Sequence, residues 1–210
     1  MTTEFYKLML ITHRQAQPLH DYLQFIEICI KSGVTSVQLR EKEAKPSFLE
    51  DFALKLQTLL APYKIPLIIN DNLELALKIN AQGLHLGQSD GSPRWAREQL
   101  HPNQYLGLSI ETENDLIRAN SYTVDYVAAS AVFPSVHKTN LRTIWGLEGL
   151  NALAQRSLNP LIAIGGINVT NVKQVMDAGA KGIAVIGALH NAPNPAAMTA
   201  NLRQFIEREV

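Results

Sequence analysis

The sequence predicts an α/β fold, specifically a single (β/α)8 TIM barrel that spans residues 1–210 as one domain. The first observation is length, because 210 residues suit one domain at the usual size of about 150 residues. The second is the alternation of short apolar runs with amphipathic stretches, each interval fitting one βα unit. The third is that no linker, charge block or low-complexity tract marks a boundary. A doubly wound sheet is the alternative, but consecutive parallel units throughout favour barrel closure.

The strand predictions rest on runs rich in Val, Ile and Leu with little polar alternation. Such runs are typical of parallel strands that are covered by helices on one face and packed inside a barrel on the other. The predicted strands are Lys7–Thr12, Thr35–Arg40, Pro66–Asn70, Gly83–Leu86, Tyr105–Ser109, Asp125–Ser130, Pro160–Ile164 and Gly182–Ile186.

Helical patterns lie between these strands. In one of them we expect Asn168 to be the N-cap, Val172 and Val175 to lie on the buried face with Met176, and Gly179 to end the helix. Three further stretches have the same pattern, namely Asp71–Asn80, Glu111–Asn120 and Pro195–Glu209.

The composition excludes several classes of protein. Hydrophobic residues make up 46% and charged residues 18% of the chain, which excludes a disordered protein. Lys plus Arg and Asp plus Glu each number 19, and this balance argues against nucleic acid as a partner. No apolar stretch approaches the about 20 residues that span a bilayer. The single cysteine, Cys29, is predicted to be a buried helical thiol and indicates a reducing, cytoplasmic location.

Functional residues of such a barrel are expected where its strands end. After the second strand, Gln38, Arg40 and Lys42 alternate along an extended segment, so their side chains share one face. Two cations facing into a barrel mouth are costly without an anionic ligand. The alternative is a solvated salt-bridge cluster with Glu41 and Glu43.

Carboxylates follow the next two strands. Asp71 comes directly after Asn70, and Asp90 follows the fourth strand. Two carboxylates at neighbouring strand ends predict a Mg²⁺ site, because Mg²⁺ takes one or two protein carboxylates and completes its shell with water and substrate phosphate. The alternative is that each aspartate caps the helix that follows it.

The last strand ends carry small residues instead. Gly166 after the seventh strand and Gly187 after the eighth allow backbone N–H groups to approach a phosphate. The longest connection, 133–145, carries Ser135, His137 and Lys138, which can donate hydrogen bonds to phosphate oxygens; the alternative for His137 is an ordinary surface residue. Together these residues indicate two anion sites, and therefore two phosphorylated substrates.

The strand-end residues resemble the thiamine-phosphate synthase family, in order and spacing, over essentially the whole chain. The resemblance implies that Asp71 and Asp90 are Mg²⁺ ligands and that Ser109 contacts a pyrimidine substrate. It implies catalytic roles on the pyrophosphate for Arg40, Lys42 and Lys138. The further substrate-binding residues that it implies are Gln38, Leu39, Glu41, Asn70, Ser135, Val136, His137, Gly166, Ile186 and Gly187.

The resemblance also implies a reaction. A transferase of this family joins 4-amino-2-methyl-5-(diphosphooxymethyl)pyrimidine to 4-methyl-5-(2-phosphooxyethyl)thiazole, with Mg²⁺-assisted release of pyrophosphate, in thiamine biosynthesis. The implied route is dissociative: pyrophosphate leaves first, and the thiazole nitrogen attacks the resulting pyrimidine cation. The partners are then two small phosphorylated molecules, with neither nucleic acid nor membrane involved, and a homo-oligomer is left open.

Several positions depart from the family's pattern. The connection after the sixth strand usually begins Gly-Pro and has a second threonine, whereas this chain has Ser130, Ala131 and His137. The usual serine after the strand-8 isoleucine is Gly187. These departures lie on the thiazole-phosphate side and leave two alternatives open: a thiazole tautomerase-like or weakened paralogue, and a non-catalytic barrel that binds phosphate ligands. Retention of Asp71 and Asp90 favours the synthase.

Overall fold

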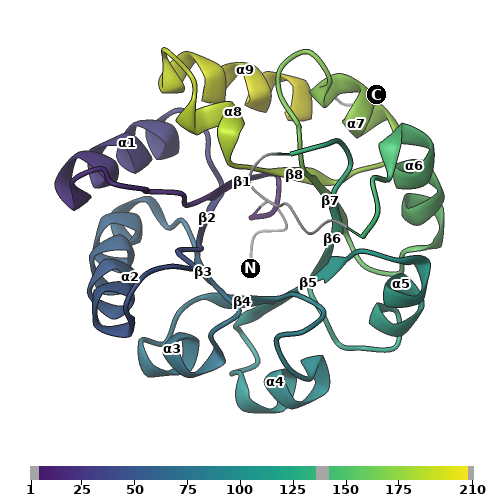
Figure 1. Cartoon of the computed structure of the whole chain (residues 1–210), viewed down its shortest axis with the longest axis horizontal. Helices are drawn as coiled ribbons and strands as arrows, with labels where there is room; N and C mark the ends of the chain where they lie inside the picture. Colours follow the sequence, from purple (N-terminus) through teal and green to yellow (C-terminus); the bar gives the residue numbers. More distant parts are fainter. Residues whose placement is uncertain (1–4, 136–141, 208–210) are drawn as a thin grey trace.

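The computed structural model describes residues 5–135 and 142–207. Its strands form a closed, all-parallel barrel in sequence order, with β1 paired to β8 (Figure 1). The strands are β1 (Leu8–Ile11), β2 (Ser36–Leu39), β3 (Leu67–Asn70), β4 (Gly83–Leu86), β5 (Tyr105–Ile110), β6 (Tyr126–Ser130), β7 (Leu161–Ile164) and β8 (Gly182–Val185). Each predicted strand is confirmed within one residue at either end, and the doubly wound alternative is wrong because the sheet closes on itself.

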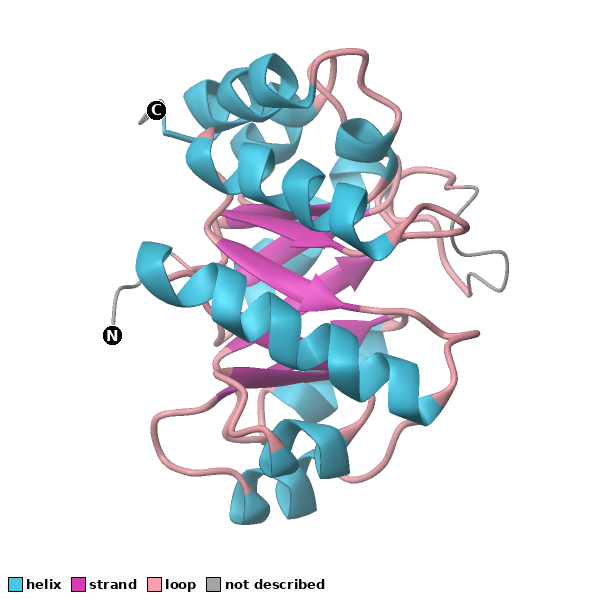
Figure 2. Cartoon of the chain, turned by 90° about the vertical axis from the view of Figure 1, so that its left-hand side faces the viewer, coloured by secondary structure: helices cyan, strands magenta, loops and turns pink. Residues whose placement is uncertain are grey.

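Helices form a ring around the barrel. The barrel strands all point toward the same end of the molecule (Figure 2). The helices are α1 (Leu19–Lys31), α2 (Pro46–Leu60), the 3₁₀ turn η1 (Ala61–Tyr63), α3 (Leu73–Lys78), α4 (Pro93–Gln99), α5 (Glu113–Ala119), α6 (Gly146–Arg156), α7 (Val172–Asp177), α8 (Gly187–His190) and α9 (Pro195–Glu207). The predicted helices therefore exist. Of these, α3 and α5 are shorter at both ends than the predicted Asp71–Asn80 and Glu111–Asn120, and α9 begins at Pro195 as predicted.

The start of α7 differs from the prediction. Asn171, not Asn168, is the N-cap. The Asn168 side chain instead accepts a hydrogen bond from the Thr170 N–H at 2.8 Å, an Asx turn that delays the helix by three residues. At the other end, Gly179 follows the C-cap Ala178 with φ +102°, as the sequence predicts.

The core has two layers, which explains why the strands read as continuous apolar runs. Leu and Ile side chains such as Leu10 and Leu67 fill the space between barrel and helices, and fully burying each stabilises the fold by about 1.5–3 kcal/mol. A smaller cluster inside the barrel includes Met9, Ile68 and Tyr126. The predicted thiol is confirmed: Cys29 is buried in α1, and burial raises its pKa to about 11.

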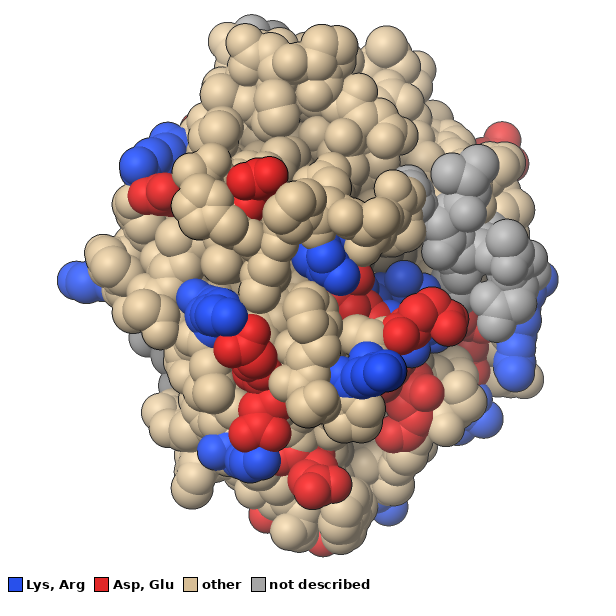
Figure 3. All heavy atoms as spheres, turned by 60° about the vertical axis from the view of Figure 1, so that its left-hand side comes forward, with Lys and Arg blue, Asp and Glu red and all other residues tan. Residues whose placement is uncertain are grey.

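The exterior carries charges of both signs. Figure 3 shows acidic and basic side chains interspersed on the face it presents. Surface ion pairs such as Lys31–Glu27 on α1 and Lys55–Asp51 on α2 account for part of this pattern. Among the described residues, none of the helices has the length and apolar character needed to cross a membrane.

Candidate active site

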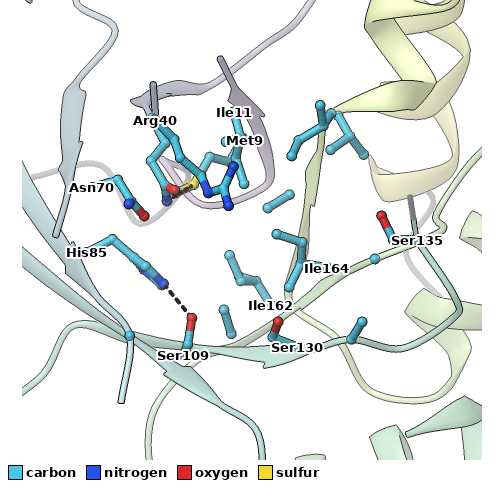
Figure 4. A pocket seen from close by; sticks show the side chains of 18 of the residues that line it. Met9, Ile11, Arg40, Asn70, His85, Ser109, Ser130, Ser135, Ile162 and Ile164 are labelled. Carbon is cyan, nitrogen blue, oxygen red and sulfur yellow. Dashed lines mark hydrogen bonds between the residues drawn. The ribbon is translucent and has the colours of Figure 1, made fainter. Parts of the chain in front are cut away.

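A cavity of about 530 Å³ opens at the carboxyl ends of the barrel strands. Every strand contributes to its lining, from Met9 of β1 to Val185 of β8. Figure 4 shows Arg40, Asn70 and His85 on one side of the cavity, and Ile162 and Ile164 of β7 with Ser130 on the other. This is the end of the barrel at which the sequence predicts function.

The cavity collects most of the predicted site residues. Those that line it are Gln38, Arg40, Lys42, Asn70, Asp71, Asp90, Ser109, Ser135, Gly166, Ile186 and Gly187. Three other predicted residues, Val136, His137 and Lys138, lie outside the described residues.

Leu39 and Glu41 lie apart from the other predicted site residues. The Leu39 side chain is buried between barrel and helices, and the Glu41 carboxylate accepts a hydrogen bond from the Arg14 N–H at 3.0 Å. Neither residue lines the cavity. The reason is strand alternation, which turns these two side chains away when Gln38 and Arg40 face inward.

Two cations face the cavity from the segment after β2. The Arg40 N–H donates to the Thr12 Oγ1 at 2.9 Å, which joins this segment to the end of β1. Within residues 5–135 and 142–207, no ion pair joins Arg40 or Lys42 to Glu41 or Glu43, so the salt-bridge alternative is wrong for the described chain. The positive charge is therefore available to an anion in the cavity.

The two aspartates do not cap helices. The N-cap of α3 is Asn72 and that of α4 is Ser92, each through its own side-chain oxygen. Asp90 Oδ2 instead accepts the Gly87 N–H at 2.9 Å. Asp71 has φ +64°, a left-handed conformation that Asp and Asn tolerate better than other side chains. The capping alternative for both aspartates is wrong.

The carboxyl group of Asp71 titrates abnormally. Burial, followed by its hydrogen bond and charge repulsion with Asp90, raises the pKa of Asp71 to about 6, while Lys42 and Asn70 act in the opposite direction. Above this pH two adjacent carboxylates repel each other across a partly desolvated space. A divalent cation between them would remove that repulsion.

These carboxylates suit a hard cation. Among the described residues no third acidic, His or Cys side chain completes a metal cluster with them. An ion held by Asp71 and Asp90 would therefore fill its remaining positions with water and ligand oxygens, which is the habit of Mg²⁺ rather than of Zn²⁺.

Glycines shape the opposite wall after β7. Gly166 has φ +64°, and a Cβ there would lie 2.7 Å from Phe133 Cβ and 2.8 Å from the Pro134 carbonyl oxygen. The backbone after β6 thus approaches the backbone after β7 more closely than any side chain would allow. Ser135 follows this contact and lines the cavity with its hydroxyl.

Sequence reasoning missed a polar chain deep in the barrel. His85 on β4 contacts Ser109 Oγ through Nε2 and Tyr126 Oη through Nδ1, each at 2.9 Å (Figure 4 shows the former). Tyr126 reaches His85 because its neighbour on β5 is Gly107, where a Cβ would lie 2.1 Å from the Tyr126 ring. The signal in the sequence was His85 itself, a lone polar residue in the strand at 83–86.

One further ion pair borders the cavity. Glu111, which is only 8% exposed, faces Arg142 with 3.6 Å between Oε2 and Nε. Both side chains line the cavity, and neither was singled out in the sequence.

A (β/α)8 barrel that gathers cations, paired carboxylates and glycine turns at its strand ends belongs to the class of enzymes that act on small phosphorylated molecules. The comparison with known families narrows this class. Residues 8–189 match the family model described as thiamine monophosphate synthase, and the chain belongs to that family.

Curated relatives with this function in their names match the chain over nearly the whole of both sequences. The chain is 42% identical to a thiamine-phosphate synthase of Chlamydia caviae over 99% of this chain and 98% of that protein. It is 40% identical to one of Vibrio parahaemolyticus, over 90% and 93% of the two chains. Among solved structures it is similar to a thiamine phosphate pyrophosphorylase from Pyrococcus furiosus, with a TM-score of 0.87, 31% identity, and coverage of 98% of this chain and 97% of that one.

Proposed function

We propose that this chain catalyses the thiamine-phosphate synthase reaction. It joins the aminopyrimidine diphosphate to the thiazole phosphate and releases pyrophosphate, as a transferase of thiamine biosynthesis. The observation that carries the proposal is the Asp71–Asp90 pair beside Arg40 and Lys42 in one cavity. A barrel that bound a single monophosphate would need only the glycine turns after β7 and β8, on the opposite wall of the cavity.

The pyrophosphate belongs on the side of β2, β3 and β4. Arg40 and Lys42 face it as fixed positive charges, and the Asn70 amide lies beside them on the same wall. These groups hold the leaving group in place and stabilise the negative charge that gathers on it as the C–O bond breaks. Lys138, outside the described residues, is proposed to add a third cation.

Asp71 and Asp90 are proposed to hold Mg²⁺, which supplies further positive charge to the pyrophosphate when bound. The chemistry of the donors supports this choice, because both are carboxylates and water and phosphate oxygens would complete the shell.

The pyrimidine ring belongs deeper, near Ser109. The hydrogen bond between His85 Nε2 and Ser109 Oγ restrains the Ser109 hydroxyl, and the contact with Tyr126 restrains His85 in turn. Apolar side chains such as Met9 and Ile162 complete this part of the cavity. They exclude water, which would otherwise trap the pyrimidine cation as an alcohol.

The thiazole phosphate belongs on the opposite wall, at Gly166, Ile186 and Gly187, with Ser135 beside it. His137 and Val136 are proposed to contribute from the segment outside the described residues. No general base is needed, because the thiazole nitrogen attacks with its own lone pair. A homo-oligomer and a cytoplasmic location stay predictions.

Release of pyrophosphate tests the proposal. The purified chain is mixed with both substrates and Mg²⁺, and we expect turnover that disappears in excess chelator. Absence of turnover with both substrates present would contradict the proposal. The departures at Ser130, Ala131 and Gly187 favour a thiazole tautomerase as the second candidate, and isomerisation of a thiazole phosphate without any pyrimidine diphosphate would identify it.

A further inference from the structure

The imidazole of His190 forms a hydrogen bond with the turn after β8, on the side away from the cavity. Ile186 has φ −116° and ψ −81°, neither extended nor helical. Its carbonyl oxygen accepts backbone N–H groups of Leu189 and His190 at 3.2 Å each, and His190 Nδ1 more closely, at 2.8 Å. The imidazole therefore makes the shortest contact that fixes this peptide unit.

Fixing the Ile186 carbonyl also fixes the next N–H. The peptide unit is planar and trans, so the N–H of Gly187 points in the opposite direction from the Ile186 carbonyl. Gly187 lines the cavity. Among the described residues, no hydrogen bond has the Gly187 N–H as its donor. A donor aimed away from His190 is thus free to meet a ligand oxygen.

The hydrogen-bond partners of His190 determine which of its ring nitrogens carries a hydrogen. A carbonyl oxygen only accepts, so Nδ1 must carry the hydrogen, and Nε2 of the neutral ring is then an acceptor. Tyr22 Oη lies 2.7 Å from Nε2 and donates to it when the ring is neutral. The same oxygen accepts the His13 N–H at 2.7 Å. With a neutral ring, all donors in this chain point one way, from His13 through Tyr22 and His190 to Ile186.

Packing holds the two rings in place. Tyr22 is fully buried on α1, and burial raises its pKa, which keeps the phenol protonated. The rings of Tyr22 and His190 are 5.7 Å apart at 28°, and Phe25, one turn along α1, lies 4.9 Å from His190. Figure 1 shows α8 next to α1, outside β1.

We propose that Tyr22 and His190 are positioning residues that aim the Gly187 N–H at the phosphate of the thiazole substrate. This inference rests on the proposed function, which places that phosphate at the Ile186–Gly187 turn. Neither side chain lines the cavity. Both act through the Ile186 carbonyl, and neither takes part in the bond-making step.

The test separates the two substrates. His190→Phe keeps a ring against Phe25 but removes the donor to Ile186. We expect KM for the thiazole phosphate to rise about tenfold, the effect of misplacing one hydrogen bond to a charged group, while KM for the pyrimidine diphosphate changes by less than about twofold. His190→Asn can still donate from its amide, and KM for the thiazole phosphate should return to within about threefold of the original value.

Two controls keep the result interpretable. His20→Phe removes an exposed imidazole from α1 and should leave both KM values unchanged. If His190→Phe does not fold, Tyr22→Phe carries the test, because it deletes only the hydroxyl and should raise KM for the thiazole phosphate alone.

The outcomes distinguish this inference from the proposed function. An unmodified chain that does not turn over the two substrates overturns the proposed function and the inference together. An active chain overturns the inference alone if both KM values rise equally in His190→Phe, if only kcat falls, or if His190→Asn behaves like His190→Phe.

Discussion

Replacing Asp71 by asparagine should stabilise the metal-free protein at neutral pH while impairing its activity. The folded chain holds Asp71 at a pKa of about 6, against an ordinary value of 3.8. When the pKa of a carboxyl is higher in the folded than in the unfolded chain, its ionisation destabilises the folded state. This destabilisation is absent at a pH below the pKa of the unfolded chain, and it reaches its full size as the pH rises through the pKa of the folded chain. Asparagine keeps the shape and tolerates the φ of +64° but carries no charge.

The size of this effect follows from the shift in pKa. At 1.36 kcal/mol per unit, the full difference corresponds to about 3 kcal/mol. Because the Asp71 carboxyl is only partly buried, solvent reduces both the desolvation penalty and the repulsion from Asp90. We therefore expect Asp71→Asn to raise the free energy of unfolding by about 1–1.5 kcal/mol at pH 8, and by nothing attributable to charge at pH 4.

Denaturant unfolding at the two pH values, with chelator present, measures the difference directly. Added Mg²⁺ should reverse the order at pH 8, since mass action stabilises the original chain and not the variant. Pyrophosphate release by the variant should fall at least tenfold, about 1.4 kcal/mol in the barrier. A variant that is less stable than the original chain at pH 8 in chelator would refute the raised pKa of Asp71 that burial and the neighbouring Asp90 produce.

The other predictions concern the two anion sites. Arg40→Gln should raise KM for the pyrimidine diphosphate at least about tenfold and change the free energy of unfolding by less than about 1 kcal/mol; a large loss of stability would make Arg40 a structural residue. Gly166→Ala should lower the free energy of unfolding by more than about 1 kcal/mol, because the φ of +64° and the Cβ contact at 2.7 Å both oppose it, and an unchanged melting temperature would contradict this. Tyr126→Phe leaves His85 Nδ1 without its phenol and should weaken binding of the pyrimidine diphosphate but not of the thiazole phosphate, as titration calorimetry of each would show.

The fold was predictable because both faces of every strand are buried. Continuous apolar runs such as 161–164 have few other uses in a chain of this composition, and their regular spacing determines the strand order. Helix starts were harder to predict. Asn168 and Asn171 both suit an N-cap, and only the Asx turn at Asn168 decides between them.

Site residues on the strands were predictable where the alternation of side chains along a strand decides which ones face the cavity. Gln38 and Arg40 face the cavity, because alternate side chains of a strand lie on the same face. Leu39 was included only because of the resemblance, and its side chain points to the other face. Tyr126 could not be found in this way. Its hydrogen bond to His85 depends on the alignment of β6 against Gly107, a register between strands that no local pattern encodes.

The hydrogen bond between Tyr22 and His190 joins residues 168 positions apart, across the seam where β1 meets β8. During translation at about 5–20 residues per second, β1 waits on the order of ten seconds or more for the strand that completes the barrel. The strand ends proposed to hold pyrophosphate, 38–90, leave the ribosome early in that interval. The turn proposed for the thiazole phosphate leaves it late, with α9 still to follow. The pyrimidine part of the cavity also needs Met9 of β1 and Ile162 of β7, so both proposed substrate sites depend on closure of the barrel between β1 and β8.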